Sequence, residues 1–369
     1  MVIAGGGTGG HVFPGIAIAE ELKMRDAGAA IFFIGTEQGI ESKIIPKEGY
    51  PLRFITAEGF VGKSPLKRLR AAFMMLGAVA GSRRLLKALK PDIVIGTGGY
   101  ASAAPVAVAC LMSIPTLITE QNLVPGLANK LLGRFVDAVA VTYHESISFF
   151  PKSKTHLTGN PIRQGILKGQ RAAACRLFSL EEDRFTIFIS GGSSGARSIN
   201  NAAVNALRHL ADLRDGIQFL HQTGESDFED VRKAYRKLGF RGTAAPFIHR
   251  MAEAYAAADL VVSRAGATTL AELTALGKPA ILIPYPHAAG HQEFNAVKLQ
   301  KAGACRMIRD AALSGGVLAA AIKEIYSSEG LRSEMRAQGL AMGRPDAAQK
   351  VVDIAQSLVN LKKPGKSYV

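Results

Sequence analysis

Short apolar runs alternate with helix-length segments along most of the 369-residue chain. Runs of four or five residues rich in Ile, Val, Leu and Phe, bounded by Gly, Asp or Pro, predict buried strands. The predicted strands are residues 31–35, 92–96, 116–119, 138–141, 186–190, 217–220, 259–263 and 280–284. Strands that alternate with helices in this way are typical of parallel sheets covered by helices on both faces, so we expect an α/β fold.

The two halves of this pattern resemble each other. Each half begins with a strand that runs into a glycine-rich turn, VIAGGGTGGH at 2–11 and FISGGSSGAR at 188–197. Each half later repeats strand, glycine turn, helix, proline and strand, at 92–118 and at 259–283. A repeat of this length indicates two similar domains rather than a solenoid.

The predicted domains are residues 1–158 and 159–346. The join lies near HLTGNPIRQGI, where Gly159 and Pro161 interrupt the pattern. Two doubly wound domains that face each other make a deep cleft, and ligands of such sheets bind beyond the carboxyl ends of the strands.

One segment imitates a membrane span, because residues 96–119 carry no charge. Glycines and prolines interrupt it, however, and a spanning helix needs roughly 20 continuous apolar residues. We therefore predict a buried helix followed by a buried strand.

Composition indicates the size of the core and the cellular compartment. Hydrophobic residues make up 48% of the chain, enough for a sizeable core. The three cysteines are far apart, match no metal spacing and are typical of buried thiols in a reducing compartment. No leader-like region precedes Gly5, so we expect no signal peptide and a cytoplasmic location.

The formal charge of +15 indicates an acidic partner, and one stretch concentrates it. No acid lies between Glu58 and Asp92. The basic residues of this segment are Lys63, Lys67, Arg68, Arg70, Arg83, Arg84, Lys87 and Lys90. They flank the apolar residues 71–81, which suits either an anionic membrane surface or a core helix with solvated ends. No RNA-binding signature supports a nucleic-acid partner.

Four glycine turns between a strand and a helix are candidate anion sites. Besides the first turn they are GTGGY at 96–100, GGSSGA at 191–196 and RAGATT at 264–269. A turn of this kind exposes backbone N–H groups at a helix N-terminus, where the helix dipole favours negative charge. Two such turns in each half predict phosphate or another anionic ligand group in the cleft.

A nicotinamide or flavin enzyme is an alternative, because Gly5, Gly7 and Gly10 match G-x-G-x-x-G. That fingerprint requires an acid at the end of the next strand to hold a ribose. The next predicted strand runs out at Ile34 and Glu37 comes too late, so this alternative is disfavoured.

No metal motif is present, neither H-E-x-x-H nor D-x-D, and the acidic residues 225–230 are better explained as the cap of a solvated helix. If a diphosphate leaves in the reaction, helix dipoles, hydroxyls and Arg163 or Arg264 must stabilise its charge. We expect no metal ion and no bound cofactor.

Several motifs together carry a family resemblance. They are GGGTGGHVFPG at 5–15, GTGGYAS at 96–102, EQN at 120–122, GNPIR at 159–163, SGGSSGAR at 190–197, RAGATTLAEL at 264–273 and HQEFNA at 291–296. In order and spacing, from about residue 2 to about residue 310, the chain resembles the MurG family of N-acetylglucosaminyltransferases, which make lipid II of bacterial peptidoglycan.

The resemblance implies a GT-B fold: two Rossmann-like domains facing a deep cleft, with a final helix at about 347–369 that packs back on the first domain. It implies that the second domain binds UDP-GlcNAc and that the first receives undecaprenyl-pyrophosphoryl-MurNAc-pentapeptide (lipid I). The sugar then passes to the MurNAc 4-hydroxyl with inversion. The implied partners are these substrates, an anionic membrane surface at the cytoplasmic face, and the cell-wall and division machinery.

The resemblance also implies site residues. Glu272 would accept hydrogen bonds from ribose hydroxyls, Ile248 would contact the uracil edge, and Gln292 would bind sugar hydroxyls. Without the resemblance, a helix-surface acid is the favoured interpretation of Glu272. A plain strand residue is an equal alternative for Ile248, and Asn122 is otherwise a turn residue. The expected donor contacts are Thr8, Gly9, Gly10, Asn122, Arg163, Ser193, Ile248, Ala267, Thr268, Thr269, Leu270, Ala271, Glu272 and Gln292. The expected acceptor side is Gly98, Gly99, Tyr100 and Glu120.

His11 is the candidate for proton transfer, because the reaction must remove a proton from a sugar hydroxyl and a neutral imidazole suits that task near pH 7. It can serve as general base or help to place the acceptor. Alternatively its ring packs against the glycine turn or contacts an acceptor phosphate.

Three alternatives share the expected fold. One is a transferase for another lipid acceptor such as diacylglycerol, one is a non-hydrolysing UDP-sugar epimerase, and one is a nucleotide-sugar sensor without catalysis. The chain departs from the family pattern at Ser194, where many relatives have glutamine, which leaves one donor contact open.

Overall fold

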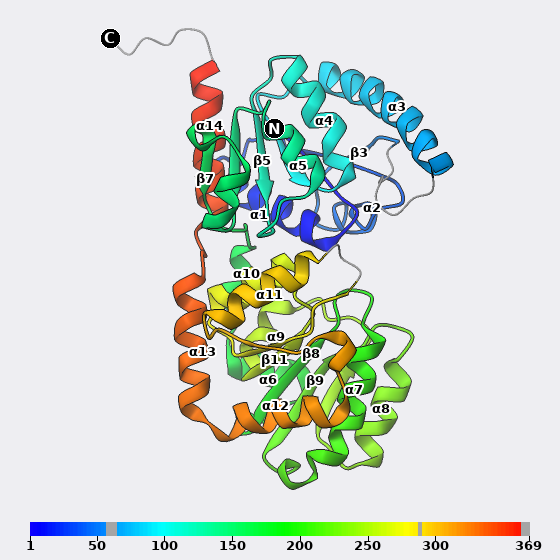
Figure 1. Ribbon diagram of the computed structural model, residues 1–369, viewed down its shortest axis with the longest axis vertical. Coiled ribbons are helices and arrows are strands. Elements are labelled where there is room, and N and C mark those ends of the chain that lie inside the picture. The colour runs from blue at the N-terminus through cyan, green and yellow to red at the C-terminus, as the bar shows by residue number, and fades with distance from the viewer. Residues whose placement is uncertain (57–64, 287–289, 363–369) are drawn as a thin grey trace. The chain divides into compact units, whose positions relative to one another are not determined.

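The structure is a computed structural model that describes residues 1–56, 65–286 and 290–362, with residues 65–75 described by their backbone alone. The chain forms two compact units (Figure 1). The first unit contains Met1–Arg163 and Arg344–Val369, and the second contains Gln164–Gly343. Arg163 therefore belongs to the first unit, whereas the sequence-based boundary assigned it to the second domain.

The first unit is built on a parallel seven-stranded sheet in the order β3-β2-β1-β4-β5-β6-β7. The strands are β1 (Val2–Gly5), β2 (Phe32–Gly35), β3 (Leu52–Phe54), β4 (Val94–Gly98), β5 (Thr116–Glu120), β6 (Ala138–Val141) and β7 (Thr155–Leu157). The helices are α1 (Gly9–Arg25), α2 (Glu41–Ile44), α3 (Pro65–Leu89), α4 (Tyr100–Leu111), α5 (Leu127–Leu132) and α14 (Ala347–Lys362). The strand order reverses between β1 and β4, and such a switch point is where doubly wound sheets bind ligands.

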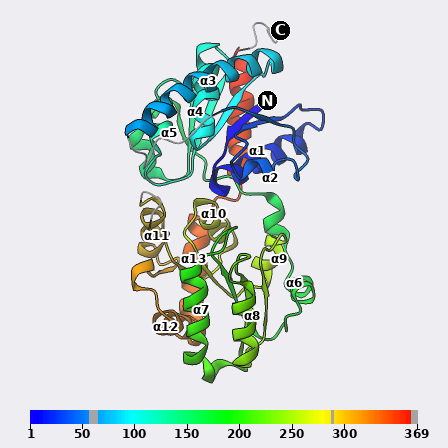
Figure 2. The same ribbon diagram turned by 90° about the vertical axis from the view of Figure 1, so that its right-hand side faces the viewer.

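Helices cover both faces of this sheet. Residues of α3 and α4 share a buried core with one face, and residues of α1 and α14 share a core with the other. Helix α14 contributes Val351, Val352 and Ala355, and it packs beside α1 although more than 300 residues separate them in the chain (Figure 2).

The second unit repeats the plan with a parallel six-stranded sheet in the order β10-β9-β8-β11-β12-β13. The strands are β8 (Phe185–Ser190), β9 (Ile217–Gln222), β10 (Gly242–Ala245), β11 (Leu260–Ser263), β12 (Ala280–Leu282) and β13 (Arg306–Met307). The helices are α6 (Arg171–Phe178), α7 (Arg197–His209), α8 (Phe228–Lys237), α9 (Met251–Ala257), α10 (Ala267–Leu276), α11 (His291–Lys301), α12 (Gly315–Ser327) and α13 (Glu329–Met342). Short 3-10 helices occupy His144–Phe149, Lys152–Lys154, Gln164–Lys168, Ala211–Leu213 and Asp310–Ala312.

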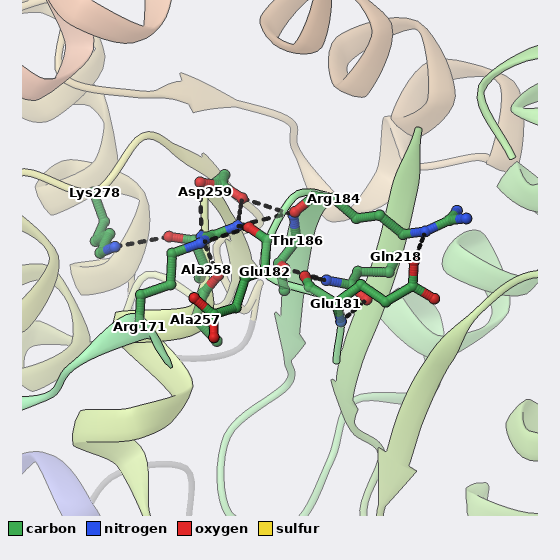
Figure 3. A network of polar contacts seen from close by, with 10 residues as sticks. All are labelled: Arg171, Glu181, Glu182, Arg184, Thr186, Gln218, Ala257, Ala258, Asp259 and Lys278. Carbon is green, nitrogen blue, oxygen red and sulfur yellow. Dashed lines mark hydrogen bonds and ion pairs between the residues drawn. The ribbon is translucent and has the colours of Figure 1, made fainter. Parts of the chain in front are cut away.

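The amino ends of β8 and β11 are held by a polar network (Figure 3). The Arg171 guanidinium donates to both carboxylate oxygens of Asp259, at 3.0 and 3.1 Å, and to the carbonyls of Glu182, Arg184 and Ala257. Asp259 also accepts the backbone N–H of Thr186 at 2.8 Å. One side chain of α6 thus fixes the entry to both central strands.

The predicted α/β class is confirmed, and each of the eight predicted strands overlaps an observed one. Residues 92–96 and 280–284 were placed slightly wrongly, because β4 starts at Val94 and continues to Gly98 while β12 ends at Leu282. The uncharged segment 96–119 contains α4 and β5, as expected. No helix in the described ranges is long and apolar enough to cross a membrane.

The basic segment lies largely on one helix. Apolar residues 71–81 and their basic flanks from residue 65 onward are parts of α3, rather than a short separate helix. Lys63 and the side chains of Lys67, Arg68 and Arg70 lie outside the described residues.

Candidate functional site

The two glycine turns of the first unit pack against each other. They follow β1 and β4, which are neighbours in the sheet, so both turns emerge at the carboxyl edge. Gly98 and Gly99 have φ of +96° and +77°, and a Cβ on Gly99 would collide with the Gly6 carbonyl oxygen. These glycines are therefore required by the approach of one turn to the other, as well as by their backbone conformation.

A carboxylate of the chain itself occupies part of the first turn. Glu41, the first residue of α2, is 1% exposed, and its Oε2 accepts the Gly7 N–H at 2.8 Å. Its Oε1 accepts the backbone N–H and the hydroxyl of Thr36, both at 2.9 Å. The expectation that this whole turn offers its amides to a ligand is thus wrong for Gly7. The predicted ligand contacts of Thr8, Gly9 and Gly10 stay predictions, and Gly9 and Gly10 begin α1.

His11 lies between the two turns. Its Nδ1 is 3.0 Å from the Gly6 carbonyl oxygen and 3.2 Å from Thr8 Oγ1. A Cβ on Gly98 would meet the imidazole edge, so the ring also packs on the second turn. The ring of Tyr100, the first residue of α4, lies against Gly7. The structure thus gathers His11 with three of the predicted acceptor-side residues.

Glu120, the fourth predicted acceptor-side residue, is engaged elsewhere. It is 3% exposed, and its oxygens accept hydrogen bonds from the following loop and from α5. The donors are the backbone N–H and Nδ2 of Asn122, the backbone N–H of Gly126 and Nδ2 of Asn129. These bonds assign Glu120 a loop-fixing role and hold Asn122 in place at the carboxyl end of β5.

Arg163 is the last residue of the first segment of this unit, Met1–Arg163. Its guanidinium lies over the Phe13 ring, 5.0 Å from the centroid, and Nη1 is 3.9 Å from a carboxylate oxygen of Glu48. Its Nε is buried and has no hydrogen-bond partner within the described ranges. Its contact with the donor stays a prediction.

The second unit presents a helix N-terminus with unused donors. Helix α10 starts at Ala267, directly after β11 and the turn at 264–266, and its first helical bond runs from Leu270 N–H to the Gly266 carbonyl. The amides of Ala267, Thr268 and Thr269 precede that bond. Thr268 is 8% exposed, and its hydroxyl has no hydrogen-bond partner in the part of the chain that the structure describes. A buried hydroxyl beside three helix-terminal amides is suited to a phosphate group.

The other predicted contacts of α10 divide by depth. Leu270 is 1% exposed and packs in the core, so only its backbone can serve a ligand, while Ala271 is half-buried. Glu272 is buried, and its Oε2 accepts the hydroxyl of Tyr255 at 2.8 Å, which fixes the orientation of the carboxylate. Gln292 on α11 accepts the Tyr285 N–H through Oε1, and Ser193 is exposed in the turn after β8.

A buried glutamine that sequence reasoning missed joins two parts of this site. Gln222 Oε1 accepts the Ile248 N–H at 2.9 Å, and its Nε2 donates to the Gly192 carbonyl at 2.8 Å. No residue in the described ranges donates a hydrogen bond to the Ile248 carbonyl, so this carbonyl is the backbone group available to a ligand. The sequence did contain one signal for Gln222: it is an amide side chain at the carboxyl end of a strand, β9, where such sheets bind ligands.

Arg264 is not a free phosphate ligand. Its guanidinium forms an ion pair with Asp310 and donates to the Ser198 hydroxyl and to the carbonyls of Ile283 and Pro284. The charge of this arginine is therefore balanced within the protein, and its stabilisation of a leaving group stays a prediction.

A cavity of about 350 Å³ lies at the opposite end of the second unit's strands. Two of its three cations are engaged: Lys278 donates to the Ala258 carbonyl and Arg332 to the carbonyls of Ile325 and Tyr326, while Arg336 is exposed. Cations are attracted to the carbonyls at helix ends even when no ligand is bound. The amino end of α10 is therefore a better candidate for the phosphate site than this cavity. In the described ranges no three His, Cys, Asp or Glu residues are grouped to hold a metal ion.

Comparison with known proteins agrees with this geometry. Residues 1–141 match the glycosyltransferase family 28 N-terminal domain and residues 186–356 match the C-terminal domain of the same family. The UDP-N-acetylglucosamine--N-acetylmuramyl-(pentapeptide) pyrophosphoryl-undecaprenol N-acetylglucosamine transferase of Thermodesulfovibrio yellowstonii is 52% identical, over 98% of this chain and 100% of its own. The enzyme of the same name from Myxococcus xanthus is 48% identical over 97% of this chain and 93% of its own.

Solved structures give the same result. MurG of Acinetobacter baumannii superposes with a TM-score of 0.75 at 30% identity, covering 96% of this chain and 98% of its own. A UDP-GlcNAc 2-epimerase of Neisseria meningitidis, at 14% identity and a TM-score of 0.70 over 96% of this chain and 98% of its own, shares the fold alone. The expected GT-B fold is thereby confirmed. The chain belongs to glycosyltransferase family 28 and, within it, to the MurG family.

Proposed function

We propose that the protein transfers GlcNAc from UDP-GlcNAc to the MurNAc 4-hydroxyl of undecaprenyl-pyrophosphoryl-MurNAc-pentapeptide, which converts lipid I to lipid II in peptidoglycan synthesis. The observation that carries this proposal is the 52% identity, along the whole of a relative named for this reaction. Epimerases resemble the chain in fold alone, so they do not support the epimerase alternative.

The donor fits the amino end of α10. The diphosphate accepts hydrogen bonds from the backbone amides of Ala267, Thr268 and Thr269 and from the buried Thr268 hydroxyl. The Glu272 carboxylate accepts hydrogen bonds from the ribose hydroxyls. The Ile248 carbonyl contacts the uracil edge. Helix-terminal amides already aimed at the diphosphate stabilise the charge that grows there as the glycosidic bond breaks. The proposed reaction needs no metal ion or bound cofactor.

The acceptor fits the first unit. In the transfer, the MurNAc 4-oxygen forms a bond to C1 of GlcNAc, the bond from C1 to the diphosphate oxygen breaks, and UDP departs with the electron pair. His11 takes the proton of the attacking hydroxyl. Attack from the face opposite UDP inverts the anomeric centre.

The first unit also offers a surface for lipid. Four exposed apolar residues lie on or next to α4 and α5, and for brevity we call them the α5 apolar face. Leu111 ends α4, Leu127 and Leu131 belong to α5, and Phe135 follows α5; they are 83%, 66%, 58% and 73% exposed. Lys130 and Arg134 lie in the same sequence segment. Apolar side chains beside cations suit the interface of an anionic bilayer, so we place the protein peripherally at the cytoplasmic face of the membrane.

The test supplies UDP-GlcNAc and a short-chain lipid I analogue and measures UDP release together with the mass of the product. Thr268→Val removes the unpartnered hydroxyl without a change of shape. A hydrogen bond to a charged group is worth about 1.5–3 kcal/mol, so kcat/KM for UDP-GlcNAc should fall about 10- to 100-fold.

Thr274→Val is the matched control, because that hydroxyl lies on the same helix and donates to the carbonyls of Leu270 and Ala271. It should leave kcat/KM within about twofold. Wild-type protein that epimerises UDP-GlcNAc and makes no disaccharide would contradict the proposed function. Equal losses of kcat/KM in Thr268→Val and Thr274→Val would contradict the placement of the diphosphate at the amino end of α10.

A further inference from the structure

One peptide group stands between Glu41 and His11. The Gly6 carbonyl and the Gly7 N–H belong to the same planar amide. The N–H donates to Glu41 Oε2 at 2.8 Å, and the carbonyl oxygen is 3.0 Å from His11 Nδ1. A carboxylate and an imidazole are thus connected through a single amide.

This arrangement determines the tautomer of His11. A carbonyl oxygen can only accept a hydrogen bond, so Nδ1 must carry the proton in the neutral ring. Thr8 Oγ1, 3.2 Å from Nδ1, can accept the same proton. Nε2 then holds the lone pair, which is the atom that a general base needs.

Glu41 acts as an acceptor in this site. Its two carboxylate oxygens accept three hydrogen bonds, from the Gly7 amide and from the amide and hydroxyl of Thr36. It makes no ion pair with Lys or Arg within the described ranges. Hydrogen bonds in series polarise one another, so the carboxylate strengthens the carbonyl as an acceptor for His11.

We propose that Glu41 is a positioning residue for His11, acting through the Gly6–Gly7 peptide to hold Nδ1–H and to stabilise the imidazolium. This rests on the proposed function for its catalytic part alone. When the 4-hydroxyl proton moves to Nε2 and UDP leaves with the electron pair of the broken bond, the imidazolium keeps Nδ1–H on the Gly6 carbonyl.

The first measurement does not depend on activity. The chain has eight histidines, and His11→Ala identifies the signal of His11 in spectra of the ¹⁵N-histidine-labelled full chain. Among the titratable groups near this ring are Glu41 from α2, through the peptide, and the Tyr100 phenol from α4, against Gly7. We expect the Nδ1–H tautomer in the wild type. An Nε2–H tautomer would overturn the proposal.

Glu41→Gln tests the charge. Because an amide has one acceptor oxygen, the variant cannot serve both Gly7 and Thr36, and it has no charge to stabilise the imidazolium. The pKa of His11 should therefore shift downward relative to the wild type, and the second tautomer should become populated. Glu21→Gln is the matched control: Glu21 is a 5% exposed carboxylate on the helix of His11 that pairs with Arg25. An unshifted His11 in Glu41→Gln would overturn the proposal.

Kinetics separate positioning from mere support of the fold. Partners that orient metal-ligating histidines through the second ring nitrogen contribute about 10- to 100-fold. We expect an effect of the same order here, so kcat of Glu41→Gln should fall by about that factor while KM for UDP-GlcNAc is unchanged. The acidic limb of the kcat profile should move to lower pH, because loss of the negative charge makes the imidazolium less stable. In Glu21→Gln the limb should stay at its wild-type position.

The double variant gives the decisive comparison. If Glu41 acts through His11, Glu41→Gln should cause no further loss of kcat in a His11→Ala background. An equal loss in both backgrounds would reduce Glu41 to a structural residue and end the proposal. A wild type with the expected tautomer and no transferase activity would refute the proposed function and leave the positioning role intact.

Discussion

At the scale of single residues, His221 shows how completely this fold excludes water from a titratable group. It is 0% exposed in β9, with Nδ1 2.8 Å from the Tyr235 hydroxyl and Nε2 3.0 Å from Asn200 Oδ1. Burial lowers the pKa of His221 from 6.5 to about 3. The ring therefore stays neutral in the folded protein throughout the physiological range.

A pH dependence of stability follows. Between about pH 6.5 and pH 3 the unfolded chain binds a proton at His221 that the folded chain does not. The free energy of unfolding should fall by up to about 1.4 kcal/mol per unit as pH drops through this window, and should be unaffected by His221 above it. Urea unfolding of the second unit, followed by a probe in β9 from pH 7.5 to pH 5, measures the slope.

His221→Gln keeps a hydrogen-bonding side chain and lacks the titration, so its stability should vary less with pH. His156→Gln is the control, because His156 is exposed in β7 and belongs to the other unit. Parallel pH profiles for wild type and His221→Gln would show that this histidine does not titrate on unfolding.

Sequence predicted some site residues better than others, for a physical reason. Thr268 and Glu272 were placed on the helix after a glycine turn because all of them lie within one short segment with one local geometry. Glu41 and Gly7 are 34 residues apart. Their contact depends on the adjacency of β1 and β2, which the sequence pattern does not specify. The same limit applies to Arg264, whose partner Asp310 is 46 residues away.

At the scale of elements, the central strands were predictable and the four edge strands were not. Central strands such as β4 and β11 are buried on both faces and appear as continuous apolar runs. The missed strands β3, β7, β10 and β13 lie at or near the sheet ends. β10 has the sequence GTAA, and its residues are exposed or half-buried, so hydrophobicity gives no signal there.

Asp259 should be important for the second unit, because it connects α6 to the amino ends of β8 and β11 (Figure 3). Asp259→Asn weakens the bidentate pair with Arg171 and leaves one acceptor for several donors. Because partly exposed charged hydrogen bonds are lost, unfolding free energy should fall by about 1–3 kcal/mol, which thermal or urea unfolding measures.

The exposed pair Glu229–Arg232 on α8 provides the comparison. Glu229→Gln should change stability by less than about 0.5 kcal/mol, since surface ion pairs contribute little. If Asp259→Asn were no more destabilising than Glu229→Gln, the network around Asp259 would contribute no more to stability than a surface ion pair.

At the scale of the whole molecule, a charge of +15 and an exposed apolar surface act together. Long-range attraction brings a cationic protein to an anionic bilayer, and apolar contact then retains it. Sequence analysis located the attraction in residues 63–90 and missed the α5 apolar face, because Leu127, Leu131 and Phe135 resemble core residues until the fold shows them exposed.

Vesicle co-sedimentation tests the α5 apolar face. Replacing Leu131 and Phe135 together by Ser removes two large apolar side chains, each worth about 1.5–3 kcal/mol when buried. The partition coefficient onto phosphatidylglycerol vesicles should therefore fall at least about tenfold. Leu177→Ser, at a 48% exposed leucine of the second unit, should leave binding unchanged. Equal binding of all three proteins would show that the bilayer does not contact this face.

The return of α14 to the first unit has a consequence for biosynthesis. The ribosome completes Met1–Arg163 early, yet the apolar face of α1 that receives Val351 and Val352 has no cover until the last helix emerges. At about 5–20 residues per second, the intervening residues Gln164–Gly343 occupy translation for on the order of ten to forty seconds. When Gly343 has been made, the second unit has all of its sequence while the first unit still lacks α14, so the segment made second is the one able to complete its fold first.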